Sequence, residues 1–301
     1  MSYLGELLSL AAPVTWAFAI IVFRKTGEAV PPLPLNIFKI LVGLILLSIT
    51  WWITLQTGSS EATSHPSGWR AYAILIGSGI TGISIADTLF LMALNRIGAG
   101  LQAIVTTSYS PSIIVMSVLF LGERLTLTQS LGVIAILTAV LFVMTMRGPR
   151  RELDRRTIAI GTVLGVSAMI AQAVSVVMMK PLLAESPVVW ANCWRMLAGV
   201  GGLLILLPFL PHEHRDGMRT LLRRSNWAGL VLGGLLGNYL SLLLWLGGMK
   251  YTQASIASAL NQTSTLWTFL LAALLLHEPI TWKRVVGLSV GMLGVALVTF
   301  G

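Results

Sequence analysis

Stretches of mostly apolar residues alternate with short charged or turn-forming breaks ten times between Leu4 and Phe300. At a rise of 1.5 Å per residue, roughly 20 apolar residues cross the ~30 Å hydrocarbon core of a bilayer. The pattern therefore predicts ten transmembrane helices and no large domain outside the membrane. We expect these helices at residues 4–23, 35–55, 71–94, 98–120, 127–146, 157–179, 187–210, 227–249, 254–276 and 283–300.

The composition agrees with a lipid environment, since 55% of the residues are hydrophobic and 10% are charged. Soluble domains carry roughly 25% charged residues. The net charge of +9 could indicate a nucleic-acid partner, but the basic residues lie in the breaks between apolar stretches. We therefore expect a lipid bilayer and a small molecule as partners, and no nucleic acid.

The cysteine content and the N-terminal residues bear on disulfides, metal sites and a signal peptide. The single cysteine, Cys193, lies inside an expected span, which excludes a disulfide framework and a cysteine-based metal site. We expect no metal and no cofactor. Residues 1–6 lack the basic region of a cleavable signal peptide, so the first apolar stretch is expected to remain as a span.

The basic residues also predict an orientation. Of the 20 Lys and Arg residues, fourteen fall on one side of the expected spans, four fall on the side of the N-terminus, and two lie within spans. Cytoplasmic loops are enriched in Lys and Arg. This bias predicts that both termini are periplasmic in a multi-pass protein of the bacterial inner membrane.

The two halves of the chain repeat each other. The tetrapeptide Asn36–Lys39 matches Asn192–Arg195 at a spacing of 156 residues, and Leu121–Thr126 matches Leu276–Thr281 at a spacing of 155. Because each half holds an odd number of spans, the second half must enter the membrane upside down. We therefore expect an all-α integral membrane protein of ten transmembrane helices, built as two inverted five-helix repeats at residues 1–150 and 151–301. Such inverted repeats are frequent in transporters.

The paired motifs Leu121–Thr126 and His277–Thr281 resemble those of the drug/metabolite transporter superfamily, in its EamA-type ten-helix branch. Within it, the chain is similar to bacterial exporters of aromatic and other neutral amino acids. The resemblance implies that the first, third, fourth, sixth, eighth and ninth helices line a central cavity, with the fifth and tenth outside. The small four-helix exporters of the superfamily carry a Glu in their first helix. Residues 12–16 hold no carboxylate, which argues against proton-coupled export of organic cations.

Asp87 is the acidic residue that lies deepest in an expected span. Charges inside a membrane are costly and are usually functional or paired. Asp87 could anchor a substrate ammonium group or carry a proton. It could equally be capped by the hydroxyl groups of Ser84 or Thr88, or face a hydrated vestibule.

Lys39 and Arg195 occupy matching positions near the starts of the second and seventh spans. Long basic side chains near helix ends can extend to the membrane surface. The alternative is a gate charge or a carboxylate clamp, for which Arg195 is the better candidate because its guanidinium can form a bidentate fork.

Polar side chains form stripes along the expected fourth and ninth helices. The spacings place each stripe on one helical face, so the two stripes can line a cavity or form interhelical hydrogen bonds. The substrate-cavity candidates are Trp16, Ser84, Asp87, Gln102, Thr106, Ser110, Gln172, Asn238, Tyr239, Ser258, Asn261, Gln262 and Thr265.

One aromatic residue and two glutamates are further candidates for a role in the cavity or in the fold. Trp16 lies inside the first span, where an indole N–H needs a partner, and can form a wall of the cavity. Glu123 and Glu278 lie at span ends and are expected to play a structural role, capping a helix or bridging to an arginine.

The chain contains no zinc-protease, phosphate-loop or nucleophile-elbow motif, so we expect neither an enzyme nor ATP hydrolysis. The leading hypothesis is a monomeric secondary transporter that exports amino acids or related small metabolites by alternating access. The alternatives are a sugar-phosphate or nucleotide-sugar antiporter, a drug exporter, and, in another class, a membrane-embedded enzyme or lipid scramblase.

Overall fold

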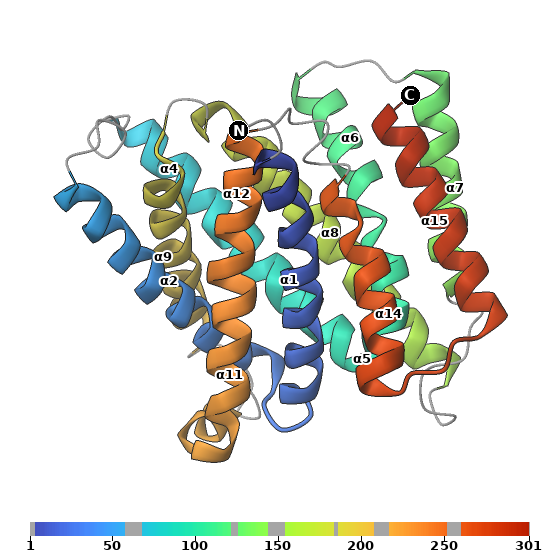
Figure 1. The fold of residues 1–301 in the computed structure, drawn as a ribbon, viewed down its shortest axis with the longest axis horizontal. Coiled ribbons are helices and arrows are strands. Elements are labelled where there is room, and N and C mark those ends of the chain that lie inside the picture. The colour runs from blue at the N-terminus through green and yellow to red at the C-terminus, as the bar shows by residue number, and fades with distance from the viewer. Residues whose placement is uncertain are drawn as a thin grey trace.

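The computed structural model describes residues 4–57, 68–121, 126–143, 154–183, 186–207, 217–251 and 260–300. Within these residues the protein is built from helices and short connections, without strands (Figure 1). The elements are α1 (Leu4–Thr26), α2 (Pro32–Gln56), α4 (Trp69–Ser78), η1 (Gly79–Ala86), α5 (Asp87–Thr106), α6 (Tyr109–Leu121), α7 (Leu127–Val143), α8 (Arg155–Leu183), α9 (Val188–Leu206), η3 (Met218–Leu222), η4 (Arg224–Asn226), α11 (Trp227–Gly233), η5 (Gly234–Leu240), α12 (Ser241–Tyr251), α14 (Ser264–Leu276) and α15 (Trp282–Phe300).

The helical segments are apolar and long. Within the described residues, six of them have the length and composition needed to cross a membrane, and the segments Leu127–Phe142 and Leu260–Leu276 are shorter but also apolar. Large hydrophobic side chains such as Ile45, Leu141 and Leu274 are exposed on the outside. An outer surface of this kind is typical of a multi-pass membrane protein, whose apolar side chains face lipid.

The sequence predicts separate third and fourth spans, but in the structure the third span continues into the first part of the fourth. Residues Trp69–Thr106 form one long apolar helical stretch. The chain redirects at Gly98, whose φ of 80° and ψ of 170° are accessible to glycine because it lacks a Cβ atom.

The predicted helix at 98–120 is also not continuous, because it is interrupted at Thr107 and Ser108. Pro111 has no N–H to donate to the carbonyl of Thr107, which accepts a hydrogen bond from the N–H of Ser110 instead (3.2 Å). The hydroxyl of Thr107 donates to the carbonyl of Ile104 (2.6 Å).

Two π-helical segments interrupt long helices, at Gly79–Ala86 (η1) and Gly234–Leu240 (η5). They begin 155 residues apart, and so do the pairs α6 with α14 and α7 with α15. Wide turns of this type are uncommon and occur frequently at functional sites.

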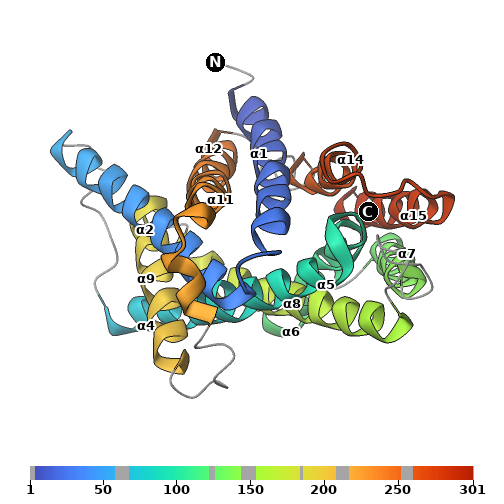
Figure 2. The same ribbon diagram turned by 90° about the horizontal axis from the view of Figure 1, so that it is seen from below.

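The helices pack in matching pairs. α1 packs against α12 and α14, while α8 packs against α5 and α6; α2 packs against η5, while α9 packs against η1. α7 and α15 pack against each other at one end of the molecule (Figures 1 and 2). The start of α1 and the end of α15 lie on the same face (Figure 1).

The largest apolar core joins α1, α5, α8 and α14. Its buried members include Ile20, Phe90 and Met169, and Trp16 and Tyr109 pack against it. The expected polar stripes lie beside this core.

Candidate functional site

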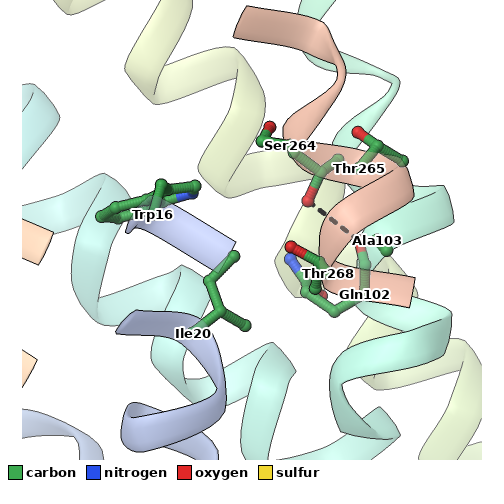
Figure 3. A pocket seen from close by; sticks show the side chains of 8 residues that line it. Trp16, Ile20, Gln102, Ala103, Ser264, Thr265 and Thr268 are labelled. Atoms are coloured by element: carbon green, nitrogen blue, oxygen red, sulfur yellow. Dashed lines mark hydrogen bonds between the residues drawn. The ribbon is translucent and has the colours of Figure 1, made fainter. Parts of the chain in front are cut away.

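A pocket lies between α1, α5 and α14 (Figure 3). Its lining residues are Trp16, Ile20, Gln102, Ala103, Thr106, Ser264, Thr265 and Thr268. Trp16 and Ile20 form an apolar side that faces the polar side chains of α5 and α14 (Figure 3). About 210 Å³ of empty space, part of it continuous with the exterior, lies within this boundary.

The polar groups of the pocket are buried and incompletely bonded. Gln102 is 1% exposed, and both its amide nitrogen and its amide oxygen lack a hydrogen-bond partner among the described residues. The hydroxyl of Thr265 is also buried, with no hydrogen-bond partner in the described ranges. An unsatisfied buried polar group costs roughly 1–3 kcal/mol. Such groups are therefore suited to a polar ligand that replaces the missing bonds.

Breaks in both polar helices lie next to this pocket. α5 ends before the turn at Thr107, and the helical residues 260–262 are separated from α14 by a turn at Thr263. Across these turns, the side-chain amide of Gln262 donates to the hydroxyl of Ser110 (2.6 Å). Asn261 is half-buried beside Gln262. The structure therefore brings together the two polar stripes identified in the sequence.

Ser258 belongs to the same stripe in the sequence but lies outside the described residues.

A second cluster consists of charged side chains from α2 and α5. The Lys39 ammonium contacts the Asp87 carboxylate at 2.5 Å and the side-chain oxygen of Asn238 at 3.4 Å. The side chain of Lys39 is 2% exposed and that of Asp87 is 24% exposed. The interpretation of Lys39 as a residue that extends to the membrane surface is therefore wrong, because protein encloses its ammonium group.

The proposed hydroxyl caps of Asp87 are engaged elsewhere. Thr88 accepts a hydrogen bond from the Asn36 amide (2.8 Å), and Ser84 donates to the carbonyl of Gly199 (2.7 Å). Ser84 is 1% exposed and holds η1 against α9, and it is not among the residues that line the pocket. Lys39 is the partner that stabilises the carboxylate of Asp87.

Arg195 is also enclosed by protein, at 6% exposed, so the same correction applies to its predicted surface position. Its two terminal nitrogens donate to the side-chain oxygen of Asn192 (3.1 Å) and to the hydroxyl of Ser175 (3.0 Å). Arg195 interacts electrostatically with Asp87 and Tyr109.

Aromatic rings connect the pocket with the charged cluster. The ring of Trp16 lies 6.2 Å from that of Phe90 and 6.3 Å from that of Phe23. The ammonium of Lys39 lies 5.6 Å from the centre of the Phe23 ring, within the range of a cation–π interaction. The pocket and the charged groups are thus adjacent parts of one region.

Two other predicted cavity residues lie apart from the pocket. The Tyr239 hydroxyl is hydrogen-bonded to that of Thr50 on α2 (2.9 Å). Gln172 is half-buried on α8 and is not part of the pocket wall described above.

Glu278 caps a helix from the other half of the chain. Its carboxylate accepts hydrogen bonds from the backbone N–H groups of Ala99 (2.9 Å) and Gly100 (3.1 Å) and pairs with Arg284 (3.2 Å). These are the cap and the arginine contact that the sequence predicted. Glu123 lies outside the described residues.

Sequence reasoning missed part of the pocket lining and the ion pair between Lys39 and Asp87. Ser264 and Thr268 line the pocket, and Thr268 lies three residues after Thr265 on the same stripe, a spacing that could have identified it. The opposite charges of Lys39 and Asp87 inside spans were a signal for pairing. Among the described residues, no group of three or more His, Cys, Asp or Glu side chains could hold a metal.

Both halves of the chain match one family of known proteins. The model of the EamA-like transporter family matches residues 3–145 and again residues 159–300. An uncharacterized transporter of Archaeoglobus fulgidus is 25% identical over 232 residues, covering 76% of this chain and 78% of the relative.

A probable terminal-alkyne amino-acid exporter of Streptantibioticus cattleyicolor is 25% identical over 292 residues, covering 95% of this chain and 90% of the relative. A solved crystal structure with 16% sequence identity matches the fold with a TM-score of 0.67, over 100% of this chain and 98% of that one.

Proposed function

We propose, since this chain belongs to the EamA-like transporter family, that it is a secondary transporter that exports aromatic and other neutral amino acids across the bacterial inner membrane. The observation behind the proposal is the pocket between α1, α5 and α14. Beside Trp16, the buried amide of Gln102 and the hydroxyl of Thr265 have no hydrogen-bond partner in the part of the chain that the structure describes. A zwitterion with an apolar side chain matches this mixture of groups.

The relative from Streptantibioticus cattleyicolor supports the substrate class, because its name describes an amino-acid exporter and the match extends over 95% of this chain. The polar groups of the pocket would hydrogen-bond the substrate, and Trp16 would pack against its side chain. Binding energy from such contacts favours the conformation in which the pocket is closed around the substrate.

The transport mechanism in this proposal is alternating access by two inverted five-helix repeats. Support comes from the double match to the family model and from the elements that begin 155 residues apart. Close packing supports it too: a Cβ atom on Gly79 would lie 2.3 Å from the carbonyl oxygen of Arg195, and one on Gly234 would lie 3.1 Å from that of Lys39. Each half therefore packs its π segment against the matching helix of the other half.

Efflux from proteoliposomes tests the function. The purified protein would be reconstituted with labelled Phe, Trp, Met or Thr inside, with protein-free liposomes as the control, and assayed with and without a proton gradient. We expect saturable, protein-dependent efflux that falls when Gln262 or Asn261 is replaced by alanine. Absence of flux for every amino acid would reject this substrate class and direct the search to sugar phosphates and nucleotides.

A further inference from the structure

The buried charges beside the pocket do not balance. Lys39 and Asp87 form an ion pair, whereas Arg195 has no carboxylate within ion-pair distance in the described part of the chain. Among the described side chains of this region, two cations and one anion leave a net charge of +1. Removing charge from water is costly unless it is paired, and within a membrane this cost is usually linked to function.

The surroundings of Arg195 are built to hold its guanidinium in place with neutral groups. Asn192 and Ser175 accept hydrogen bonds from its two terminal nitrogens, while its Nε is buried without a partner among the described residues. Gly82 makes room on η1, because a Cβ atom there would lie 2.3 Å from the hydroxyl of Ser175 and 3.3 Å from a terminal nitrogen of Arg195.

We infer that Arg195 binds the carboxylate group of the transported substrate, an inference that rests on the transport function proposed above. The substrate carboxylate supplies the missing negative charge, and the unpartnered Nε–H supplies a charge-assisted hydrogen bond. Lys39 does not take this role, because Asp87 already neutralises it at 2.5 Å.

Tyr109 connects Arg195 with the pocket. It packs in the apolar cluster that contains Trp16, and it interacts electrostatically with Arg195. A substrate whose carboxylate binds Arg195 would therefore place its remaining groups near Tyr109, in the cluster that contains Trp16. The net positive charge also disfavours amines that lack a carboxylate, so the inference defines selectivity as well as affinity.

Competition in the unmodified protein provides the first test. Proteoliposomes would take up labelled Phe in the presence of 3-phenylpropionate, which keeps the carboxylate, or of phenylalaninamide or phenethylamine, which lack it. We expect 3-phenylpropionate to compete, and the two amines to compete roughly tenfold more weakly or worse, the loss expected for about one charge-assisted hydrogen bond. Equal competition by the amines would overturn the inference.

A variant series provides the second test. Arg195→Gln should raise the KM for Phe by about tenfold or more and bring the ratio of Phe to phenylalaninamide transport close to one, while Arg195→Lys should keep part of the discrimination because it keeps the charge. Arg96→Gln is the matched control, since Arg96 is exposed at the end of the same span as Asp87. A folded Arg195→Gln variant with unchanged discrimination would contradict the role.

A binding measurement separates this inference from the proposed function. The melting temperature of the purified protein would be recorded with 3-phenylpropionate and with phenethylamine. If only 3-phenylpropionate stabilises the protein and no amino acid is transported, the carboxylate site at Arg195 is supported and the proposed substrate class is rejected. Amino-acid transport combined with equal stabilisation by both compounds would retain the function and reject the site.

Discussion

At the scale of single residues, we expect substitution of Gln102 to reduce transport without reducing the stability of the fold. The Gln102 amide is buried and finds no hydrogen-bond partner among the residues that the structure describes, so its polar groups cost free energy in the unliganded protein. We expect Gln102→Leu to reduce amino-acid flux by roughly tenfold or more while leaving the free energy of unfolding unchanged or higher by up to about 3 kcal/mol. Initial transport rates and the melting temperature in detergent measure the two effects.

Gln56→Leu is the matched control, because it makes the same chemical change at an exposed position near the end of α2. We expect it to change neither flux nor melting temperature. A Gln102→Leu variant that transports normally, or that is strongly destabilised, would mean that Gln102 is a packing residue and not a substrate contact.

Glu278 is the residue whose loss should destabilise the fold. Its carboxylate pairs with Arg284, which is 2% exposed, and caps the N–H groups of Ala99 and Gly100. Glu278→Gln leaves a buried cation unpaired, so we expect it to lower the free energy of unfolding by about 3–5 kcal/mol. Thermal melting with and without the second change Arg284→Gln measures this loss.

The double variant should recover part of the lost stability, because it removes the unpaired charge together with its partner. Additive losses in the double variant would show that the ion pair does not couple the two residues.

At the scale of elements, the π segment η1 packs closely against α9 because position 79 is a glycine. A Cβ atom at Gly79 would lie 2.3 Å from the carbonyl oxygen of Arg195, which belongs to the backbone of α9 and cannot rotate away. We expect Gly79→Ala to destabilise the protein by about 1–3 kcal/mol, the usual cost of overpacking. Thermal melting measures the change.

Gly201→Ala on α9 is the control, since nothing lies within 4 Å of a Cβ atom added there. This substitution should be neutral or stabilise the helix by about 0.5–1 kcal/mol, because alanine has the higher helix propensity. Equal effects of the two substitutions would show that close contact between η1 and α9 is not required.

The element boundaries show where sequence prediction fails. The long apolar stretches of α1, α2, α8 and α9 follow from hydrophobicity, which is a local property. The interruption at Thr107 has a local cause in Pro111, whereas the helix that follows the redirection at Gly98 is capped by Glu278 from the other half of the chain. The sequence therefore predicts helices more reliably than it predicts breaks within them.

At the scale of the whole molecule, orientation is the testable property. Fourteen Lys and Arg residues on one side of the expected spans and four on the other predict periplasmic termini. The start of α1 and the end of α15 lie on one face (Figure 1). We expect a C-terminal alkaline phosphatase fusion to be active and a C-terminal green fluorescent protein fusion to be dark in bacterial cells. Fluorescence from the green fluorescent protein fusion would place the C-terminus in the cytoplasm and contradict the predicted orientation.

The sequence by itself determined the helical class, the lipid environment, the repeated motifs and most of the polar residues near the pocket. These properties depend on composition and on periodicity along the chain, which neighbouring residues define. The polar stripes that contain Gln102 and Gln262 were visible for this reason.

The tertiary structure alone decided the partners of the buried polar groups. Lys39 pairs with Asp87 across 48 residues, and Glu278 caps Ala99 across 179 residues. It also decided that Ser84 bonds to a neighbouring helix and that Arg195 is enclosed with no carboxylate at ion-pair distance among the described residues. The physical reason is that a polar side chain within an apolar span has several possible partners, and helix packing determines which of them comes within hydrogen-bonding distance.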